Sequence, residues 1–425
     1  MNKGTEIFNL IKELQPIHRS LTGEGVRETL EVVKQHVPLE LHHIPSGTRV
    51  LDWVVPKEWK IKDAYIKNAQ GEKVIDFNKN HLHVLGYSVP VKKKLSFREL
   101  KANLHTLPDH PDWIPYLTSY YKENWGFCLS HSQLTKLKDE EYEVCIESSL
   151  EDGNLNYGEI FIKGESSDEM LFSTYVCHPW MCNDNLSGVA LAAFMAKHIA
   201  SKKRRYSYRF LWVPETIGAI AWLSRNEDKL RNIKHGLVIT CVGDPGPMTY
   251  KKTKMGNAEI DRAVLQVLKD SGEEFRIFDF FPTGSDERQY SSPGFNLPVG
   301  SLMRTRYEHF DEYHTSADDL DFIKPEHLAD SFDKYAQVVD TLEGNRKYIN
   351  LSPKGEPQLG RRGLYELIGG HKYRAELDNA VFWLLNLSDG NHDLLGVAER
   401  SKMKFDVLKN AADILVEKGL LNGLD

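Results

Sequence analysis

Between residues 170 and 270, apolar strand-like segments alternate with helix-like segments, and this alternation limits the fold more than any other feature of the chain. The segments with strand character are 170–176, 208–213 and 236–242. The segments with helical spacing of apolar residues are 187–199, 219–224 and 260–269. Strands alternating with helices of this length are typical of a parallel sheet that is buried on both faces. The sequence therefore predicts an α/β fold with a mostly parallel sheet flanked by helices.

The segments before this core have a different character. Apolar residues recur at helical spacing in most of the first 37 residues, and 39–44 alternates like a strand that meets a turn. Short strands separated by turn residues follow, and we predict an inserted β-rich domain over 46–135. Residues 142–146 and 157–163 are predicted to pair as antiparallel strands. The α/β domain is then expected to comprise 1–45 and 136–350.

The C-terminal part is predicted to be a separate module. Pro353–Pro357 is a linker-like hinge, and helical patterns follow, the last two at 393–398 and 405–417. Helix, short turn, helix and a small β end are the outline of a winged helix-turn-helix, which we place at 355–425. Its nine lysines and arginines against eleven acidic residues give a net charge of −2. Because DNA-binding modules are normally basic, nucleic acid is not an expected partner.

Composition excludes several classes of protein. The formal net charge is −7, which argues against a general nucleic-acid binder. No apolar run approaches the length of about 20 residues that crosses a bilayer, and the polar N-terminus does not resemble a signal peptide. Five cysteines form no disulfide framework and are consistent with a reducing compartment. We therefore expect a cytoplasmic protein without membrane contact.

Polar residues with metal-binding chemistry stand near the predicted strand ends. They are His178, Asp184, Glu215, Asp244 and His314. Open α/β sheets bind ligands at the carboxyl ends of their strands, and imidazole with carboxylate is what zinc or manganese takes in a hydrolytic site. Each residue also has a structural alternative, such as a helix N-cap for Asp184 or a turn aspartate for Asp244. Five of them in this order favour a metal site over five unrelated structural roles.

These residues carry a resemblance to a known family. The series Cys177-His178-Pro179, Asn183-Asp184-Asn185-Leu186-Ser187-Gly188, Pro214-Glu215-Thr216-Ile217-Gly218, Gly243-Asp244, Gly284-Ser285-Asp286 and Tyr313-His314-Thr315-Ser316-Ala317-Asp318 resembles the M28-type zinc aminopeptidases. The whole chain looks like the bacterial aminopeptidase-like proteins that have an inserted β domain and a C-terminal winged helix. Members of that group are often found in polysaccharide-biosynthesis contexts.

The resemblance implies a role for each residue. His178 matches the first histidine ligand, Asp184 the bridging aspartate, Asp244 the later carboxylate ligand and His314 the last histidine ligand. Glu215 falls in a paired-glutamate motif, in which one glutamate is the general base and the next is a ligand, so both roles stay open for it. The implied cofactor is zinc, with one or two ions per chain.

Two positions depart from the family pattern. The usual His-x-Asp has Trp180 as its third residue here, and the paired glutamates are Glu215-Thr216. Zinc does not usually take a neutral threonine hydroxyl where carboxylates are available, so one of two ions would be weakly held or absent.

Residues for the substrate are suggested by chemistry alone. An aminopeptidase must hold a free ammonium group, for which Asp286, Glu287 and Glu308 are candidates, and solvated loop acids are the alternative. Arg288 could pair with a substrate carboxylate, and Tyr313 could act as a catalytic donor to an oxyanion.

The sequence thus predicts a metal-dependent hydrolase of peptide or amide bonds, with an aminopeptidase as the first expectation. The expected substrate is a small peptide or an amide of an amino acid or amino sugar. Alternatives are deacylation of an amino sugar or polysaccharide precursor, a non-catalytic sugar- or peptide-binding protein on the same fold, and a DNA-binding regulator. A homo-oligomer would form through the C-terminal module or the inserted domain.

Overall fold

The computed structural model describes residues 2–364 and 372–424, which form two compact units. The first unit comprises 1–255 and 276–332, and the second comprises 256–275 and 333–425. Helix α9 (Pro325–Gly344) runs from the first unit into the second. Each unit is described by itself below.

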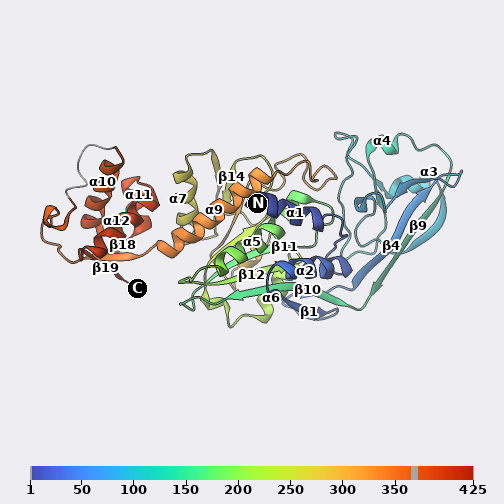
Figure 1. The fold of residues 1–425 in the computed structure, drawn as a ribbon. Coiled ribbons are helices and arrows are strands. Elements are labelled where there is room, and N and C mark those ends of the chain that lie inside the picture. The colour runs from blue at the N-terminus through green and yellow to red at the C-terminus, as the bar shows by residue number, and fades with distance from the viewer. Residues whose placement is uncertain (1, 365–371, 425) are drawn as a thin grey trace. The chain divides into compact units, whose positions relative to one another are not determined.

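An eight-stranded sheet forms the centre of the first unit (Figure 1), with the strand order β1-β10-β12-β11-β13-β16-β14-β15. In that order the strands span Glu40–Pro45, Asn154–Ile162, Ser207–Val213, Glu169–Tyr175, Ile233–Ile239, Val299–Met303, Met248–Lys251 and Phe275–Phe278. The four central strands, β12, β11, β13 and β16, are parallel to one another, whereas β1, β10 and β14 pair antiparallel at the sides. The predicted mostly parallel α/β sheet is therefore confirmed.

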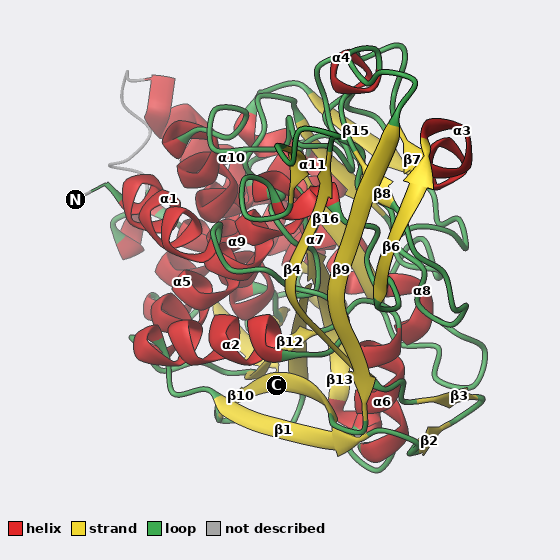
Figure 2. Cartoon of the chain, turned by 90° about the vertical axis from the view of Figure 1, so that its right-hand side faces the viewer, coloured by secondary structure: helices red, strands yellow, loops and turns green. Residues whose placement is uncertain are grey.

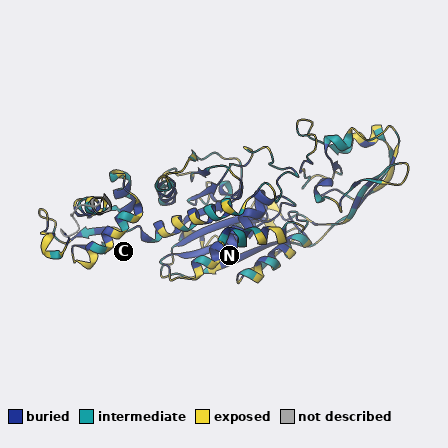
Figure 3. Cartoon of the chain, turned by 45° about the horizontal axis from the view of Figure 1, so that its top comes forward, coloured by how far each residue is buried: buried dark blue, intermediate teal, exposed yellow. Residues whose placement is uncertain are grey.

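Helices cover both faces of this sheet. The helices of the first unit, besides α9, are α1 (Lys3–Leu14), α2 (Glu24–His36), α3 (Phe97–Leu100), α4 (His131–Leu134), α5 (Gly188–Ala200), α6 (Ile217–Arg225) and α8 (Glu287–Tyr290). On β12, Trp212 donates its indole N–H to a carbonyl of α5, while the preceding Leu211 packs in a cluster with Trp222 of α6. Because neighbouring residues of a strand point to opposite faces, α5 and α6 lie on opposite sides of the sheet. Figure 3 shows the central strands as buried, as a strand covered on both faces must be.

A second, antiparallel sheet lies beside the first in the same unit, with the order β5-β4-β9-β6 (Figure 2). Its strands span Lys73–Asp76, Glu58–Lys67, Glu141–Glu151 and Val91–Ser96. Two short pairs accompany it, namely β2 (Arg49–Val50) with β3 (Trp53–Val54) and β7 (Leu104–His105) with β8 (Phe127–Cys128).

The predicted pairing of 142–146 with 157–163 is wrong. The first segment lies in β9, which pairs with β4 and β6, and the second lies mostly in β10, which pairs with β1 and β12. The Glu151–Asn154 turn therefore joins two sheets and does not close a hairpin. Periodicity detected both strands, but it carries no information on which distant strand supplies the hydrogen-bond partner.

The second unit contains the elements of the predicted winged helix-turn-helix. Helices α10 (Lys372–Leu387), α11 (Leu394–Ser401) and α12 (Phe405–Glu417) accompany an antiparallel sheet of β18 (Asp389–Asp393), β17 (Lys347–Asn350) and β19 (Leu421–Leu424). Residues 365–371 of the predicted module lie outside the described part of the chain.

Helix α7 (Glu259–Ser271) also belongs to this unit, although it precedes β15 in the chain. Its Arg262 forms two 2.8 Å hydrogen bonds to the Asp393 carboxylate and a further one of 2.8 Å to Glu399. This fork of charge-assisted bonds ties α7 to the start and the middle of α11.

Within the described ranges, no helix is both long enough and apolar enough to cross a lipid bilayer.

Candidate metal centre

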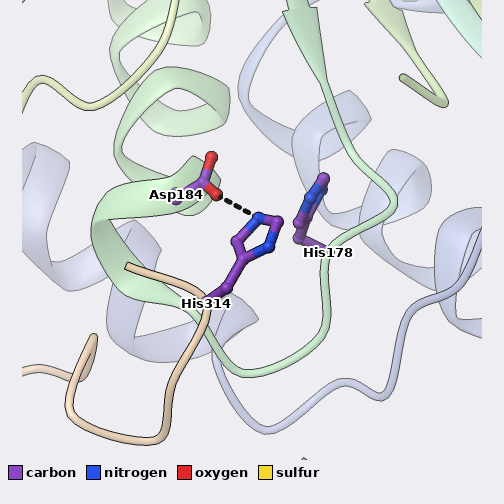
Figure 4. A group of neighbouring side chains, drawn as sticks. All are labelled: His178, Asp184 and His314. Atoms are coloured by element: carbon purple, nitrogen blue, oxygen red, sulfur yellow. Dashed lines mark ion pairs between the residues drawn. The ribbon is translucent and has the colours of Figure 1, made fainter. Parts of the chain in front are cut away.

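Three side chains from two separate loops meet near the carboxyl ends of the parallel strands (Figure 4). His178 follows β11, Asp184 lies in the turn before α5, and His314 lies in the loop between β16 and α9. One possible ligand atom from each residue lies within 4.8 Å of the others. The spacing matches a site where two imidazoles and a carboxylate share one cation.

His178 is held as a neutral imidazole. Its side chain is 5% exposed, and burial lowers its pKa to about 4, an effect that the nearby His314 reinforces and the Asp184 carboxylate opposes. The neutral ring is the form that binds metal ions. The buried Arg19 donates from Nε to the His178 carbonyl over 2.9 Å and so fixes the backbone that carries this ring.

The two carboxylate oxygens of Asp184 have different neighbours, Tyr175 and His314. Its Oδ1 accepts a short hydrogen bond from the Tyr175 hydroxyl, which in turn lies 2.6 Å from the Thr240 hydroxyl. Its Oδ2 lies 3.0 Å from His314 Nε2. Burial alone would raise the pKa of Asp184, but His178 and His314 outweigh it and hold the pKa below its ordinary value.

The facing atoms of Asp184 and His314 fit a metal ion. Both Oδ2 and Nε2 are buried, and apart from the 3.0 Å contact between them neither has a hydrogen-bond partner among the residues that the structure describes. Buried polar atoms are normally satisfied, and a cation held by both atoms would satisfy them in place of their contact with each other. A divalent cation that takes nitrogen and oxygen ligands, such as Zn²⁺, satisfies this requirement.

Asp318 fixes the loop that carries Asp184. Its two carboxylate oxygens accept the backbone N–H groups of Asn183 and Asp184 over 2.6 and 2.8 Å. The side chain of Asp318 is fully buried. Asp318 thus sets the position of the Asp184 backbone from the loop that also carries His314.

Asp244 is not one of the three residues whose ligand atoms meet here. Its oxygens accept hydrogen bonds from the Asn183 side chain (3.1 Å), the Gly246 N–H (2.8 Å) and the Thr305 hydroxyl (2.5 Å). The observed contacts therefore support the loop around Asp184. Its role as a metal ligand stays a prediction.

Glu215 borders the centre from the end of β12. Its Oε2 lies 3.8 Å from His178 Nε2, and its backbone N–H donates to the Cys177 thiol over 3.2 Å. Burial raises the pKa of Glu215 well above its ordinary value, and the carboxylates of Asp286 and Asp184 add to this shift. A carboxyl with a raised pKa beside a metal centre has the character of a proton acceptor and donor.

The threonine that departs from the family pattern has its polar groups occupied. Thr216 has a positive φ of 64°. Its N–H donates to Asp286 over 2.7 Å, and its hydroxyl accepts from Arg288 over 3.1 Å. Burial raises the pKa of Asp286 to about 7. The predicted substrate residues Asp286 and Arg288 thus converge on the residue next to Glu215.

The remaining predicted residues lie on the His314 loop. The Tyr313 ring stacks on the His314 imidazole with centroids 3.9 Å apart, and burial raises the pKa of its hydroxyl well above the ordinary value. Glu308 is exposed. The catalytic role of Tyr313 and the substrate role of Glu308 stay predictions.

Sequence reasoning missed three residues that support this centre: Tyr175, Asn183 and Arg19. Asn183 stands within the Asp184 motif and Tyr175 just before Cys177, but the motifs assigned neither side chain a supporting role. Arg19 lies 159 positions from His178, and no local pattern points from one to the other.

Comparison with known proteins identifies the family of the chain. Residues 8–345 match the model of a family described as a domain of unknown function, DUF4910, and residues 346–423 match a winged helix-turn-helix model. The chain belongs to the DUF4910 family.

One relative aligns with nearly the whole chain. A Clostridium acetobutylicum protein named "Putative polysaccharide biosynthesis protein with aminopeptidase-like domain" is 59% identical over 418 residues, which are 98% of this chain and 96% of the relative. The crystal structure of a "putative peptidase" from the same organism is 58% identical with a TM-score of 0.94, over 99% of this chain and 96% of that one.

More distant structures share the fold over most of the chain. BSAP, a zinc aminopeptidase from Bacillus subtilis, is 11% identical with a TM-score of 0.58, over 80% of this chain and 95% of that one. A peptidase M28 precursor from Shewanella amazonensis is 14% identical with a TM-score of 0.57, over 80% and 93%. The chain therefore has the zinc aminopeptidase fold with a C-terminal winged helix.

Proposed function

We propose that this protein is a metal-dependent hydrolase of peptide or amide bonds, acting as an aminopeptidase with one zinc ion held by His178, Asp184 and His314. The observation that carries the proposal is the convergence of these three side chains, in which the buried Oδ2 and Nε2 atoms have no hydrogen-bond partner among the described residues besides their 3.0 Å contact with each other. The zinc aminopeptidase fold of structures such as BSAP supports it.

The protein's own residues divide the work. When bound, the zinc ion would supply Lewis acidity to polarise a carbonyl and to lower the pKa of water. Glu215 would accept a proton at Oε2 and return it to the leaving nitrogen, because it borders His178 and its pKa is raised by burial. Tyr175 would keep the Asp184 carboxylate oriented, and Tyr313 would donate to the developing oxyanion.

The surroundings of Thr216 favour one ion rather than two. The threonine hydroxyl accepts from Arg288, and Asp244 receives its hydrogen bonds from protein groups. Neither residue presents a free anionic oxygen to a second ion. The buried Asp286 would serve a substrate ammonium group through its Oδ2, which has no hydrogen-bond partner among the described residues.

A second candidate is deacylation of an amino sugar by the same centre. The name of the Clostridium acetobutylicum relative, which refers to polysaccharide biosynthesis, favours it. The chemistry is the same amide hydrolysis, so the substrate alone distinguishes the two functions.

Metal analysis and turnover test the proposal together. We expect one zinc per chain in the wild type, none in Asp184→Ala, and one in the control Asp311→Asn, which changes an exposed acid of the His314 loop. Glu215→Gln should keep the zinc and lose turnover of aminoacyl anilides or of N-acetylated amino sugars. Equal metal content in the wild type and Asp184→Ala would reject the centre, and loss of zinc from Glu215→Gln would make Glu215 a ligand.

A further inference from the structure

The segment Ile114–Tyr116 of the inserted region lies against the loops that carry all three proposed ligands. It belongs to residues 46–135, whereas the ligands stand at 178, 184 and 314. Three kinds of contact join the inserted region to the metal centre.

The first contact is a short backbone pairing with the His314 loop. Pro115 forms an antiparallel bridge with Thr315, and the Tyr116 N–H donates to the His314 carbonyl over 2.8 Å. On the other side, the Ser316 N–H donates to the Ile114 carbonyl over 2.9 Å. His314 has a φ of 54°, in the left-handed region that a residue with a side chain seldom adopts. Such a conformation persists only where its surroundings fix it. Here the backbone hydrogen bonds to Ile114 and Tyr116 hold the His314 backbone in place.

The second contact is made by the Tyr116 ring with both imidazoles. Its centroid lies 5.5 Å from that of His178 and 5.2 Å from that of His314. The Tyr116 side chain is buried, and its hydroxyl lies 3.1 Å from the hydroxyl of Tyr120, another residue of the inserted region. The ring, rather than the hydroxyl, therefore faces the two histidines.

This packing matters because His178 has a weak polar support. Histidine ligands usually donate their second ring N–H to a carboxylate or a carbonyl, which fixes the ring. Here the His178 Nδ1 faces the Cys177 thiol at 3.5 Å. A thiol is a weak hydrogen-bond partner, so the packing of Tyr116 takes a larger share in orienting the ring.

The third contact joins the inserted region to the loop between His178 and Asp184. Met181 of that loop packs in one buried cluster with Ile114, Tyr116 and two further residues of the inserted region, and Trp180 packs against this cluster. The Trp180 indole N–H donates to the Ser316 carbonyl over 3.0 Å and so links the two ligand loops directly.

We infer that the inserted region is an integral part of the metal centre, with Tyr116 as a positioning residue for His178 and His314 and Trp180 as the link between their loops. The inference rests on the proposed metal centre. It also gives Trp180, which departs from the family's His-x-Asp pattern, a role in this protein.

The test measures metal binding without relying on turnover. Zinc affinity is determined by competition with a chromophoric chelator, and the visible spectrum of the Co²⁺-substituted protein reports ligand geometry. Tyr116→Ala should weaken zinc binding about 10- to 100-fold and alter the Co²⁺ bands, as loss of support around metal ligands typically does. Tyr116→Phe should rescue both, because the ring is retained.

Tyr142→Ala is the matched control. It removes a buried tyrosine of β9, whose hydroxyl bonds the Lys138 backbone, so it perturbs the second sheet without touching the ligand loops. We expect it to lower the urea midpoint and to leave the zinc affinity unchanged. If Tyr116→Ala fails to fold, Trp180→Phe tests the same inference by removing one N–H, and it should also weaken zinc binding.

The outcomes separate this inference from the proposed function. The inference would be overturned if the wild type binds zinc and the folded Tyr116→Ala or Trp180→Phe protein has the same zinc affinity and the same Co²⁺ spectrum. The proposed metal centre would then still stand. Equal weakening by Tyr142→Ala would also overturn it, because the effect would then be general destabilisation. A wild type that binds no zinc would overturn the proposed centre itself.

Discussion

The two hydrogen bonds that Asp318 accepts allow a quantitative prediction for the loop of Asp184. Both donors are backbone N–H groups, and the acceptor side chain is fully buried. Leaving one buried donor unsatisfied costs about 1–3 kcal/mol. Asp318→Asn keeps one oxygen acceptor and turns an NH₂ group toward the other donor, so it should lower the free energy of unfolding by about 1–3 kcal/mol. Asp318→Ala loses both acceptors and should cost about 2–6 kcal/mol.

Urea unfolding in the presence of a chelator measures this cost apart from metal binding. Zinc affinity, measured on the folded variants, should fall as well, because Asp318 fixes the backbone that presents the Asp184 carboxylate. The control is the neighbouring Asp319→Asn, whose Oδ1 accepts from the N–H groups of Asp321 and Phe322 in a turn that asparagine also forms. We expect the control to stay within about 0.5 kcal/mol of the wild type. An Asp318→Asn protein that matches this control in both urea midpoint and zinc affinity would refute the reasoning.

Three further predictions concern other parts of the molecule. Tyr175→Phe removes the hydroxyl that donates to Asp184, so zinc affinity should fall about tenfold by chelator competition, and unchanged affinity would count against this role. Arg262→Ala removes the fork to Asp393 and Glu399, and thermal unfolding should show a loss of about 1–3 kcal/mol in the second unit, whereas a change confined to the first unit would contradict it. Burial lowers the pKa of His235 to about 3, from the value of 6.5 that applies in the unfolded chain. Below pH 6.5 the unfolded chain therefore binds a proton that the folded protein excludes, and the folded protein loses stability as the pH falls. The free energy of unfolding should fall by about 2 kcal/mol from this group between pH 7 and pH 5. His235→Gln should flatten this part of the pH profile, and an equally steep profile would refute the assignment.

Local patterns were sufficient for the elements that carry the site. The helix predicted at 187–199 is α5 (Gly188–Ala200), and the strand predicted at 170–176 is β11 (Glu169–Tyr175). Apolar spacing encodes these elements because each buries one face or both in the core. The strand at 142–146 was also detected, but its partner was not, because the partner is set by a sheet that forms between distant segments.

For the candidate centre, sequence motifs indicated His178, Asp184 and His314, which the structure brings together. The same motifs indicated Asp244, whose oxygens accept hydrogen bonds from Asn183, Gly246 and Thr305 and whose role as a ligand stays a prediction. Both aspartates stand beside a predicted strand or helix end, so their local sequences could not distinguish them.

The order of apolar strands and helices determined the α/β class of this protein, since burial on a sheet imposes a period that can be read along the chain. Residue chemistry at strand ends determined that a cation site was the best expectation. Tertiary structure alone decided which side chains meet there and that Tyr116, from an inserted region, packs on both histidines. The physical reason is that distances between loops depend on the packing of whole elements, and residues 62 and 198 positions apart in the chain carry no local sign of such contact.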